Sequence, residues 1–181
     1  MHKSFIISGS GGQGVISMGN ALASIIMLND LFVSLSSSYG AEMRGGAVNC
    51  EINMSDKEIL SIRNDKVDYL VALNQTSLDK FISKVKENGT IIINSSLAKI
   101  NELRQDIKLI TFPFTQEAIK LGNIKIANSI ALGVLLKTIG NFTYENIKPI
   151  FEKLLKDKPN LIEKNLEALK IGLNYVSKQG I

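Results

Sequence analysis

The glycine-rich segment at residues 9–14 constrains the fold of this chain more than any other part of the sequence. Gly9, Gly11 and Gly14 have the spacing G-x-G-x-x-G, and an apolar run at residues 4–8 precedes them. After them, apolar side chains recur every three or four residues, as on one face of a helix: Val15, Met18, Leu22 and Ile25. Glycine permits a tight turn and close packing of a helix on a strand, so this segment predicts a strand, a turn and a helix.

The rest of the chain continues the alternation and then becomes helical. Further strands are predicted at residues 31–35, 47–53, 66–73, 90–93 and 108–112, which are apolar or alternate in polarity. A helix face between two of these strands is expected from four apolar residues: Leu78, Phe81, Ile82 and Val85. Later helices are expected at residues 126–139, 147–154 and 162–176. This order predicts an α/β fold, a single three-layer Rossmann-like domain over residues 1–181 with a mainly parallel sheet and a helical C-terminal third.

Cysteine and histidine are nearly absent, which removes several classes of chemistry. Cys50 is the only cysteine and His2 the only histidine. One thiol cannot close an intrachain disulfide or ligate an iron–sulfur cluster, and a His/Cys metal site is also excluded. Cys50 lies in an alternating strand without an evident cationic neighbour, so we expect a buried structural residue. We predict no catalytic residue and no metal ligand in this chain.

The charge pattern indicates an ordinary globular surface. The 21 basic and 17 acidic residues give a net charge of +4, and the two signs alternate in the second half of the chain. No basic stripe is interleaved with aromatic residues, so we expect no nucleic-acid binding. The longest nearly apolar run, residues 130–136, is too short to span a bilayer, and the N-terminus does not resemble a signal peptide. The expectation is a cytoplasmic protein without membrane contact.

The glycine-rich turn has two interpretations that the residues leave open. One is an anion site, because a helix N-terminus presents unpaired N–H groups and the positive end of the helix dipole. The other is a purely structural turn. The acidic residue that would bind a ribose at the end of the second strand is missing, since residues 32–38 contain no carboxylate. This absence counts against a nicotinamide cofactor.

A second loop, residues 38–46, follows the second predicted strand and is expected at the same sheet edge. Arg44, beside Gly45 and Gly46, could reach a carboxylate or a phosphate, and Tyr39 offers a ring and a hydroxyl group. The alternative is a structural turn in which Arg44 pairs with Glu42 or with backbone carbonyl groups.

Both loops together resemble the γ subunit, or the matching domain, of 2-oxoacid:ferredoxin oxidoreductases. The similarity is carried by Gly-Ser-Gly-Gly-Gln-Gly-Val at residues 9–15 and, more specifically, by Ser-Tyr-Gly-Ala-Glu-Met-Arg-Gly-Gly at residues 38–46. Further matches follow in order along the chain: Pro113, Ala118, Leu121, Gly122, Asn123, Ala127, Asn128, Leu132, Gly133, Asn165, Ala168 and Gly172. The Ala-Glu-Met variant at residues 41–43 is most similar to enzymes for 2-oxoglutarate or related 2-oxoacids.

The resemblance implies a complex in which this chain is one subunit. A 2-oxoacid, such as pyruvate or 2-oxoglutarate, is decarboxylated on thiamine pyrophosphate. Electrons pass through iron–sulfur clusters to ferredoxin or flavodoxin, and the acyl group passes to coenzyme A. The implied partners are α and β subunits that bind thiamine pyrophosphate, with a ferredoxin-like δ subunit as a further candidate. The γ chain would hold no cofactor wholly by itself and would be inactive when isolated.

Within that complex, we hypothesise that the two loops form an anion-binding edge for part of coenzyme A. The candidate residues are Gly9, Gly11, Gly12, Gln13, Gly14, Tyr39, Arg44, Gly45 and Gly46. The same loops could instead serve protein contact alone. Two other functions stay open: a stand-alone NAD(P)- or FAD-dependent oxidoreductase, and a stand-alone Rossmann-like nucleotide-binding module without partner subunits.

Overall fold

The computed structural model describes residues 1–39, 47–61, 64–102, 104–140 and 142–178. The chain divides into two compact units, Met1–Pro113 and Phe114–Ile181, and each is described by itself. The expectation of a single domain over residues 1–181 stays a prediction.

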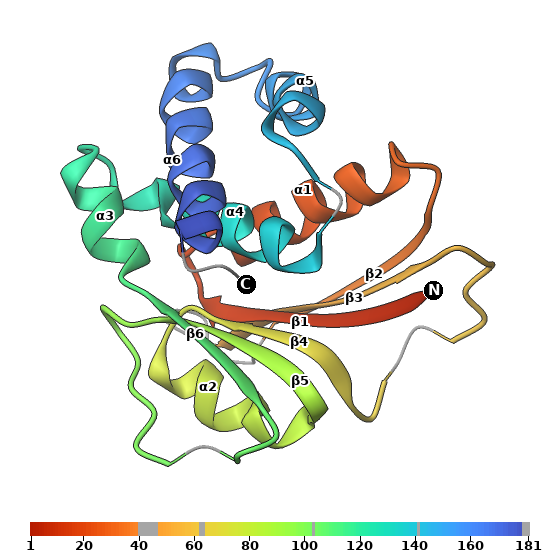
Figure 1. The fold of residues 1–181 in the computed structure, drawn as a ribbon. Helices are drawn as coiled ribbons and strands as arrows, with labels where there is room; N and C mark the ends of the chain where they lie inside the picture. Colours follow the sequence, from red (N-terminus) through yellow and green to blue (C-terminus); the bar gives the residue numbers. More distant parts are fainter. Residues whose placement is uncertain (40–46, 62–63, 103, 141, 179–181) are drawn as a thin grey trace. The chain divides into compact units, whose positions relative to one another are not determined.

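The first unit is built on a six-stranded mixed sheet (Figure 1). Its strands are β1 His2–Ser10, β2 Phe32–Tyr39, β3 Ala47–Ser55, β4 Val67–Ala72, β5 Val85–Asn94 and β6 Lys108–Phe112. They lie in the order β2-β3-β1-β4-β5-β6, and β3 is antiparallel to both of its neighbours. The other pairs, β1-β4, β4-β5 and β5-β6, are parallel, so every strand except β3 runs in one direction. The α/β class and the mainly parallel sheet are confirmed.

Two helices cover opposite faces of this sheet. Helix α1, Val15–Met27, packs on β1, β2 and β3, and α2, Gln75–Phe81, packs on β1 and β4 from the other side (Figure 1). On the α2 side, Leu78 and Phe81 join buried strand residues such as Leu70 and Ile91 in one apolar cluster. The three layers expected from the sequence are present within this unit.

One helix boundary differs from the sequence expectation. Helix α2 ends at Phe81, a 3₁₀ turn, η1, covers Ile82–Lys84, and Val85 begins β5 instead of completing a helix face. Val85 is fully buried and pairs with Val67 of β4. The pairing of parallel strands therefore outweighs the three- and four-residue apolar spacing, which is a local signal only.

Helix α1 lies close to the sheet because Gly19 has no side chain. A β-carbon at Gly19 would lie 2.8 Å from the Cys50 sulfur atom and 3.5 Å from a Leu35 methyl group. Cys50 is fully buried, its Sγ lies 3.5 Å from Ser37 Oγ, and burial raises the pKa of its thiol. The prediction of a buried Cys50 is confirmed. A raised pKa keeps the thiol protonated and therefore unreactive, as expected of a residue that serves packing.

The second unit is helical. Its elements are α3 Phe114–Lys120, the 3₁₀ turn η2 Ile124–Ile126, α4 Ala127–Ile139, α5 Tyr144–Leu154 and α6 Pro159–Lys178. Residues 129–136 of α4 are all buried, which agrees with its apolar sequence and with the expectation of a core helix. The helical C-terminal third is confirmed.

Helices α4 and α6 meet at two glycines. A β-carbon on Gly133 would overlap the Leu169 carbonyl oxygen, and one on Gly172 would overlap the Ile130 carbonyl oxygen. Nearby, the buried Ser129 hydroxyl donates a hydrogen bond of 2.6 Å to Asn165 Oδ1. Backbone-to-backbone packing at this crossing explains why both positions hold glycine.

An ion pair ties three strands together at the opposite end of the sheet from the glycine loop. Asp68 of β4 accepts hydrogen bonds of 2.8 Å from the Ser4 N–H and hydroxyl groups of β1, and 3.0 Å from Lys86 of β5. Burial alone would raise the pKa of the Asp68 carboxyl group. The hydrogen bonds from Lys86 and Ser4 outweigh that effect, so the pKa is lowered.

Replacement of Gly172 by alanine is expected to destabilise the second unit, because the added methyl group would displace the Ile130 carbonyl group of α4. Overpacking of this kind costs about 1–3 kcal/mol. Urea denaturation followed by circular dichroism measures the change. Asn174→Ala, at an exposed position of the same helix, is the matched control. Equal stability of the two variants would contradict a backbone contact between α4 and α6.

Acid is expected to weaken the first unit through Asp68. The folded pKa lies below the unfolded value of about 4, so the stabilisation is complete above pH 4 and is lost as the pH falls through the folded value. Asp68→Asn should unfold more easily than the wild type at neutral pH, and lose less stability between neutral pH and about pH 3. Thermal unfolding across this range tests the prediction. The exposed control Asp65→Asn should follow the wild-type profile.

Candidate functional site

The glycine loop lies beside the loop that follows β4. Strands β1 and β4 are parallel neighbours, with Ser8 opposite Ala72. The Leu73 N–H group, just beyond β4, donates a hydrogen bond of 2.9 Å to the Ser8 carbonyl oxygen. The turn after β1 and the turn after β4 therefore leave the sheet side by side at its carboxyl edge, where parallel α/β sheets bind ligands.

Gln13 fastens these two turns together. Its Oε1 accepts a hydrogen bond of 2.7 Å from the Ser10 N–H group and one of 2.8 Å from Asn74 Nδ2. Its Nε2 donates a hydrogen bond of 3.2 Å to the Leu73 carbonyl oxygen. A side-chain amide thus satisfies backbone groups in both turns, which fixes the shape of residues 10–13 without help from a ligand.

Asn74 extends this connection into helix α2. Its Oδ1 caps the helix by accepting a hydrogen bond of 2.9 Å from the Ser77 N–H group. Its Nδ2 also donates a hydrogen bond of 2.7 Å to Ser10 Oγ. The fully buried Ser77 hydroxyl contacts the Ser8 hydroxyl of β1 at 3.0 Å. Asn94, at the end of β5, donates a hydrogen bond of 3.2 Å from its Nδ2 to the Leu73 carbonyl oxygen.

These hydrogen-bonded residues form what we call the carboxyl-edge network: Ser8, Ser10, Gln13, Leu73, Asn74, Ser77 and Asn94. Among them, only Gln13 is a residue that the sequence singles out as a site candidate. Asn74 and Asn94 each stand at or just after the carboxyl end of a buried strand. A polar residue in that position is a signal by which sequence reasoning could have found them.

The glycines of the loop have different roles. Gly9 is buried, and a β-carbon there would lie 2.8 Å from Gln13 Oε1 and 2.9 Å from a Val15 methyl group. Gly14 precedes α1 with a φ of 74°, a left-handed conformation that glycine adopts readily. Both positions are explained by folding alone.

Gly11 and Gly12 are the exposed part of the loop. A β-carbon on either glycine would meet nothing within 4 Å, so both face open space. Within the part of the chain that the structure describes, their N–H groups have no hydrogen-bond partner. The first turn of α1 carries no acidic side chain. These residues can present backbone donors to an anion at the start of a helix.

Tyr39 lies at the same edge of the sheet. It pairs with Val48 of β3, and Val48 pairs with Gly9 of β1, so the three residues form one row across the sheet. Two strand spacings separate Tyr39 from Gly9, about 10 Å. The Tyr39 side chain is 69% exposed. The other candidates of that loop, Arg44, Gly45 and Gly46, lie outside the described residues.

The described part of this edge offers hydrogen bonds and packing surface. No group of three or more His, Cys, Asp or Glu residues in the described ranges could hold a metal ion. The described helices also include none that is long and apolar enough to cross a membrane. The arrangement fits binding of an anionic group or of another protein.

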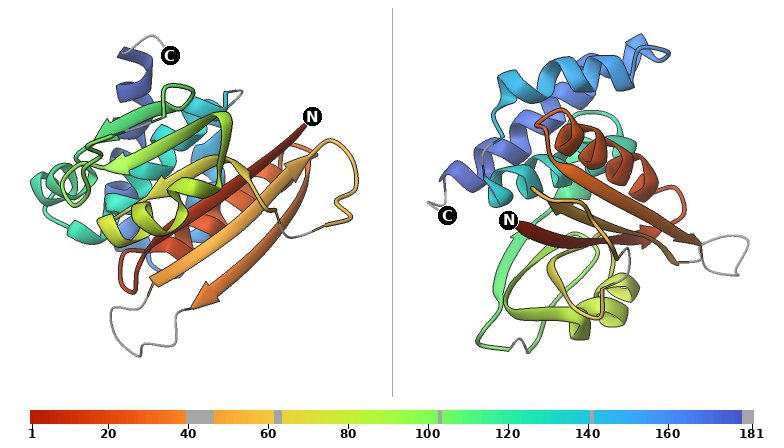
Figure 2. Two further views of the ribbon diagram at one scale, coloured as in Figure 1. Left: turned by 90° about the horizontal axis from the view of Figure 1, so that it is seen from below. Right: turned by 90° about the vertical axis from the view of Figure 1, so that its right-hand side faces the viewer.

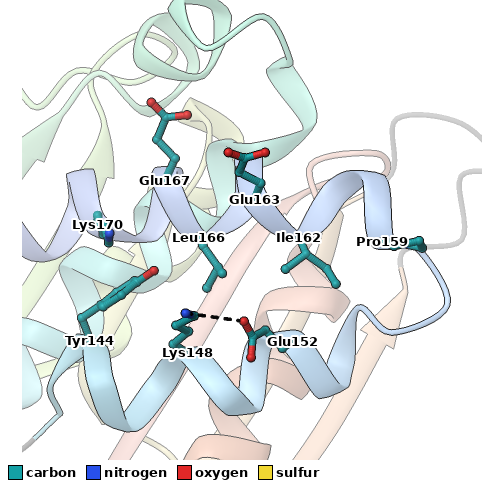
Figure 3. Close-up of a pocket in the computed structure, with 9 residues that line it drawn as sticks. All are labelled: Tyr144, Lys148, Glu152, Pro159, Ile162, Glu163, Leu166, Glu167 and Lys170. Carbon is teal, nitrogen blue, oxygen red and sulfur yellow. Dashed lines mark ion pairs between the residues drawn. The ribbon is translucent and has the colours of Figure 1, made fainter.

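A separate groove of about 670 Å³ lies between α5 and α6 in the second unit (Figure 3). Leu166 and Ile162 contribute apolar surface, and the charged side chains around them include the ion pair between Lys148 and Glu152, 3.8 Å apart. Lys170 Nζ lies 4.3 Å from the centre of the Tyr144 ring. Such paired, solvated charges are ordinary on amphipathic helices, so the groove is not the candidate site.

Comparison with known proteins gives a consistent set of similarities. The family model described as pyruvate ferredoxin/flavodoxin oxidoreductase matches residues 4–175. The chain is 35% identical to the 2-oxoglutarate synthase subunit KorC of Archaeoglobus fulgidus, over 92% of this chain and 83% of that protein. The γ subunit of a keto/oxoacid ferredoxin oxidoreductase from Geobacter sulfurreducens has a similar structure, with a TM-score of 0.77 and 28% identity over 95% of this chain and 96% of the other.

Some relatives are much longer than this chain. The ketoisovalerate oxidoreductase subunit VorA of Methanothermobacter marburgensis is 32% identical over 95% of this chain, but the match covers only 36% of VorA. The chain therefore spans about a third of this relative and most of the length of KorC.

Replacement of Gln13 by alanine should loosen the turn that carries Gly11 and Gly12. The change removes three hydrogen bonds, and we expect a loss of about 1–3 kcal/mol in the free energy of unfolding. Hydrogen exchange at the Ser10 amide should become faster, because this N–H group loses its acceptor, Gln13 Oε1. Gln105→Ala, at an exposed position, is the matched control and should leave both quantities unchanged. If Gln13→Ala behaved like this control, the hydrogen bonds of Gln13 would not hold the two turns together.

Proposed function

This chain belongs to the pyruvate ferredoxin/flavodoxin oxidoreductase family, and from that membership we propose that it is the γ-type subunit of a 2-oxoacid:ferredoxin oxidoreductase. The observation that carries the proposal is a family match over nearly the whole chain, together with the similar structure of a γ subunit that aligns over nearly its full length. The reaction is the coenzyme A-dependent oxidative decarboxylation of a 2-oxoacid, with 2-oxoglutarate as the first substrate to test.

The work is divided among subunits in this proposal. This chain has one cysteine, so it cannot supply the thiolates of an iron–sulfur cluster. Thiamine pyrophosphate and the clusters belong to α and β partners and to a ferredoxin-like δ chain, with ferredoxin or flavodoxin as the electron acceptor. The γ chain supports assembly and contributes binding surface. Alone, it is inactive.

The binding surface is the carboxyl edge of the sheet. The exposed N–H groups of Gly11 and Gly12, at the start of α1, suit a phosphate group of coenzyme A. Tyr39 lies in the same row across the sheet as Gly9. Arg44 follows Tyr39 by five residues in the sequence. Arg44 adds a guanidinium group that can bind phosphate through two hydrogen bonds. Gly45 and Gly46 leave the adjoining backbone free of side chains.

The test is Arg44→Ala in the complete complex, produced with its partner chains. Loss of a charge-assisted hydrogen bond costs about 1.5–3 kcal/mol, so KM for coenzyme A should rise roughly 10- to 100-fold, while KM for the 2-oxoacid should not change. Arg104→Ala is a matched control, because Arg104 pairs with Asp106 in a different loop. Steady-state kinetics with each substrate varied in turn give both constants.

The outcomes separate ligand binding from protein contact. If Arg44→Ala fails to retain the partner chains during purification and the complexes that form use coenzyme A normally, the loop is a protein contact. Unchanged kinetics together with unchanged assembly would defeat both roles for Arg44. Oxidation of 2-oxoglutarate by the isolated chain would overturn the division of labour itself.

A further inference from the structure

Among the strands that the structure describes, β2 forms a free edge of the sheet. It pairs with β3 on one side and is the terminal strand in the order β2-β3-β1-β4-β5-β6 (Figure 2). Every second residue of such a strand directs its N–H and C=O groups away from the sheet. Residues 36–39, its second half, are exposed. The edge is thus available to another strand.

This edge lacks the features by which proteins block unwanted strand pairing. Its sequence, Phe-Val-Ser-Leu-Ser-Ser-Ser-Tyr at Phe32–Tyr39, contains no charged residue and no proline. The opposite edge strand, β6, is five residues long, begins with Lys108 and is followed by Pro113. Short length, lysine and proline are known protections of an edge. The contrast suggests that β6 is protected against pairing, whereas β2 is adapted to it.

The two faces of β2 differ in chemistry. Leu35 lies near Gly19 of α1, and Ser37 contacts Cys50 on that side of the sheet. By alternation, Val33 and the 69% exposed Tyr39 belong to this face. On the other face, Ser34 accepts a hydrogen bond of 3.0 Å from Asn53, and the 52% exposed Phe32 shares that face with the three serines at positions 34, 36 and 38.

We propose that β2 is extended in the assembled enzyme by a strand of a partner subunit, the chain that corresponds to the remaining two thirds of VorA. This inference rests on the proposed function. In VorA, the region similar to this chain shares one polypeptide with that remainder, which keeps the two close together. Relatives such as KorC match this chain along most of their own length, and a γ chain of that kind needs a non-covalent contact instead. An open strand edge provides one through backbone hydrogen bonds.

The chemistry of β2 defines the partner strand. The partner strand is uncharged at its centre. It carries apolar side chains on the face of Val33, Leu35 and Tyr39, and small polar side chains opposite Ser36 and Ser38. It also places an apolar side chain beside Phe32. Aromatic and β-branched pairs across strands stabilise a sheet by roughly 0.2–1 kcal/mol each.

A second copy of this chain fits the edge less well than a partner strand. In a symmetric antiparallel pair, residues directly opposite each other share a face of the sheet. Within such a pair, Phe32 would lie opposite one of the serines at positions 34, 36 and 38, so its ring would find no apolar neighbour. The exposed Phe32 therefore favours a strand of different sequence.

Hydrogen exchange of β2 in the free chain and in the purified complex tests the inference. Amide exchange at the residues of β2 whose N–H groups point away from β3 should be at least tenfold slower in the complex, while β6 should change little. Equal exchange of β2 in a complex that is active and stoichiometric would overturn the inference and leave the proposed function intact. Failure of the wild-type chain to form a complex with the partner would instead defeat the proposed function on which it rests.

A charge placed on the edge should weaken assembly. Ser36→Lys and Ser38→Lys alter exposed positions, so the isolated variants should unfold at the wild-type temperature. Binding of the co-expressed partner chain should weaken at least tenfold. Ser83→Lys, an identical change at an exposed site in η1, should bind normally. Wild-type affinity in both edge variants would contradict the proposal. A dimer of the isolated chain that protects β2 would assign the edge to a second copy and also overturn it.

Discussion

The Gln13 side chain is the constraint on which the carboxyl edge of the sheet depends. It joins the turn after β1 to the turn after β4, and Asn74 carries the connection onward into α2. A loop of several glycines would otherwise sample many conformations, because glycine loses more conformational freedom on folding than any other residue. With Gln13 in place, the turn that carries Gly11 and Gly12 is held by the protein itself.

In the second unit, glycine permits the close packing of two helices. Helices α4 and α6 approach until their backbones touch at Gly133 and Gly172, and Ser129 hydrogen-bonds to Asn165 within the contact. Close packing of this kind gains many small dispersion contacts that bulkier side chains would prevent. Several residues of the family resemblance, including Gly133, Asn165 and Gly172, are therefore explained by folding, so they carry no direct information about catalysis.

The two proposed surfaces, for a ligand and for a partner strand, meet at β2. Tyr39 ends this strand in the row that contains Gly9, next to the proposed ligand edge, while the outer side of the same strand is the proposed partner contact. In a multisubunit enzyme, a binding surface that borders a subunit contact can be completed by the neighbouring chain. This geometry fits the proposed role, in which a polypeptide with one thiol and one imidazole contributes shape and backbone donors.

The sequence by itself determined most of the strands and helices and their succession along the chain, and it excluded cluster and disulfide chemistry, because apolar periodicity and residue counts are local properties. It did not predict α3 from its apolar pattern. It predicted β6 to the residue and the buried Cys50. It misplaced Val85, whose strand pairing lies with Val67, far away in the chain. Only the tertiary structure decided that β3 runs antiparallel, that Asn74 and Asn94 join Gln13, and that β2 is a free edge. These features depend on contacts between distant segments, and no local pattern encodes such contacts.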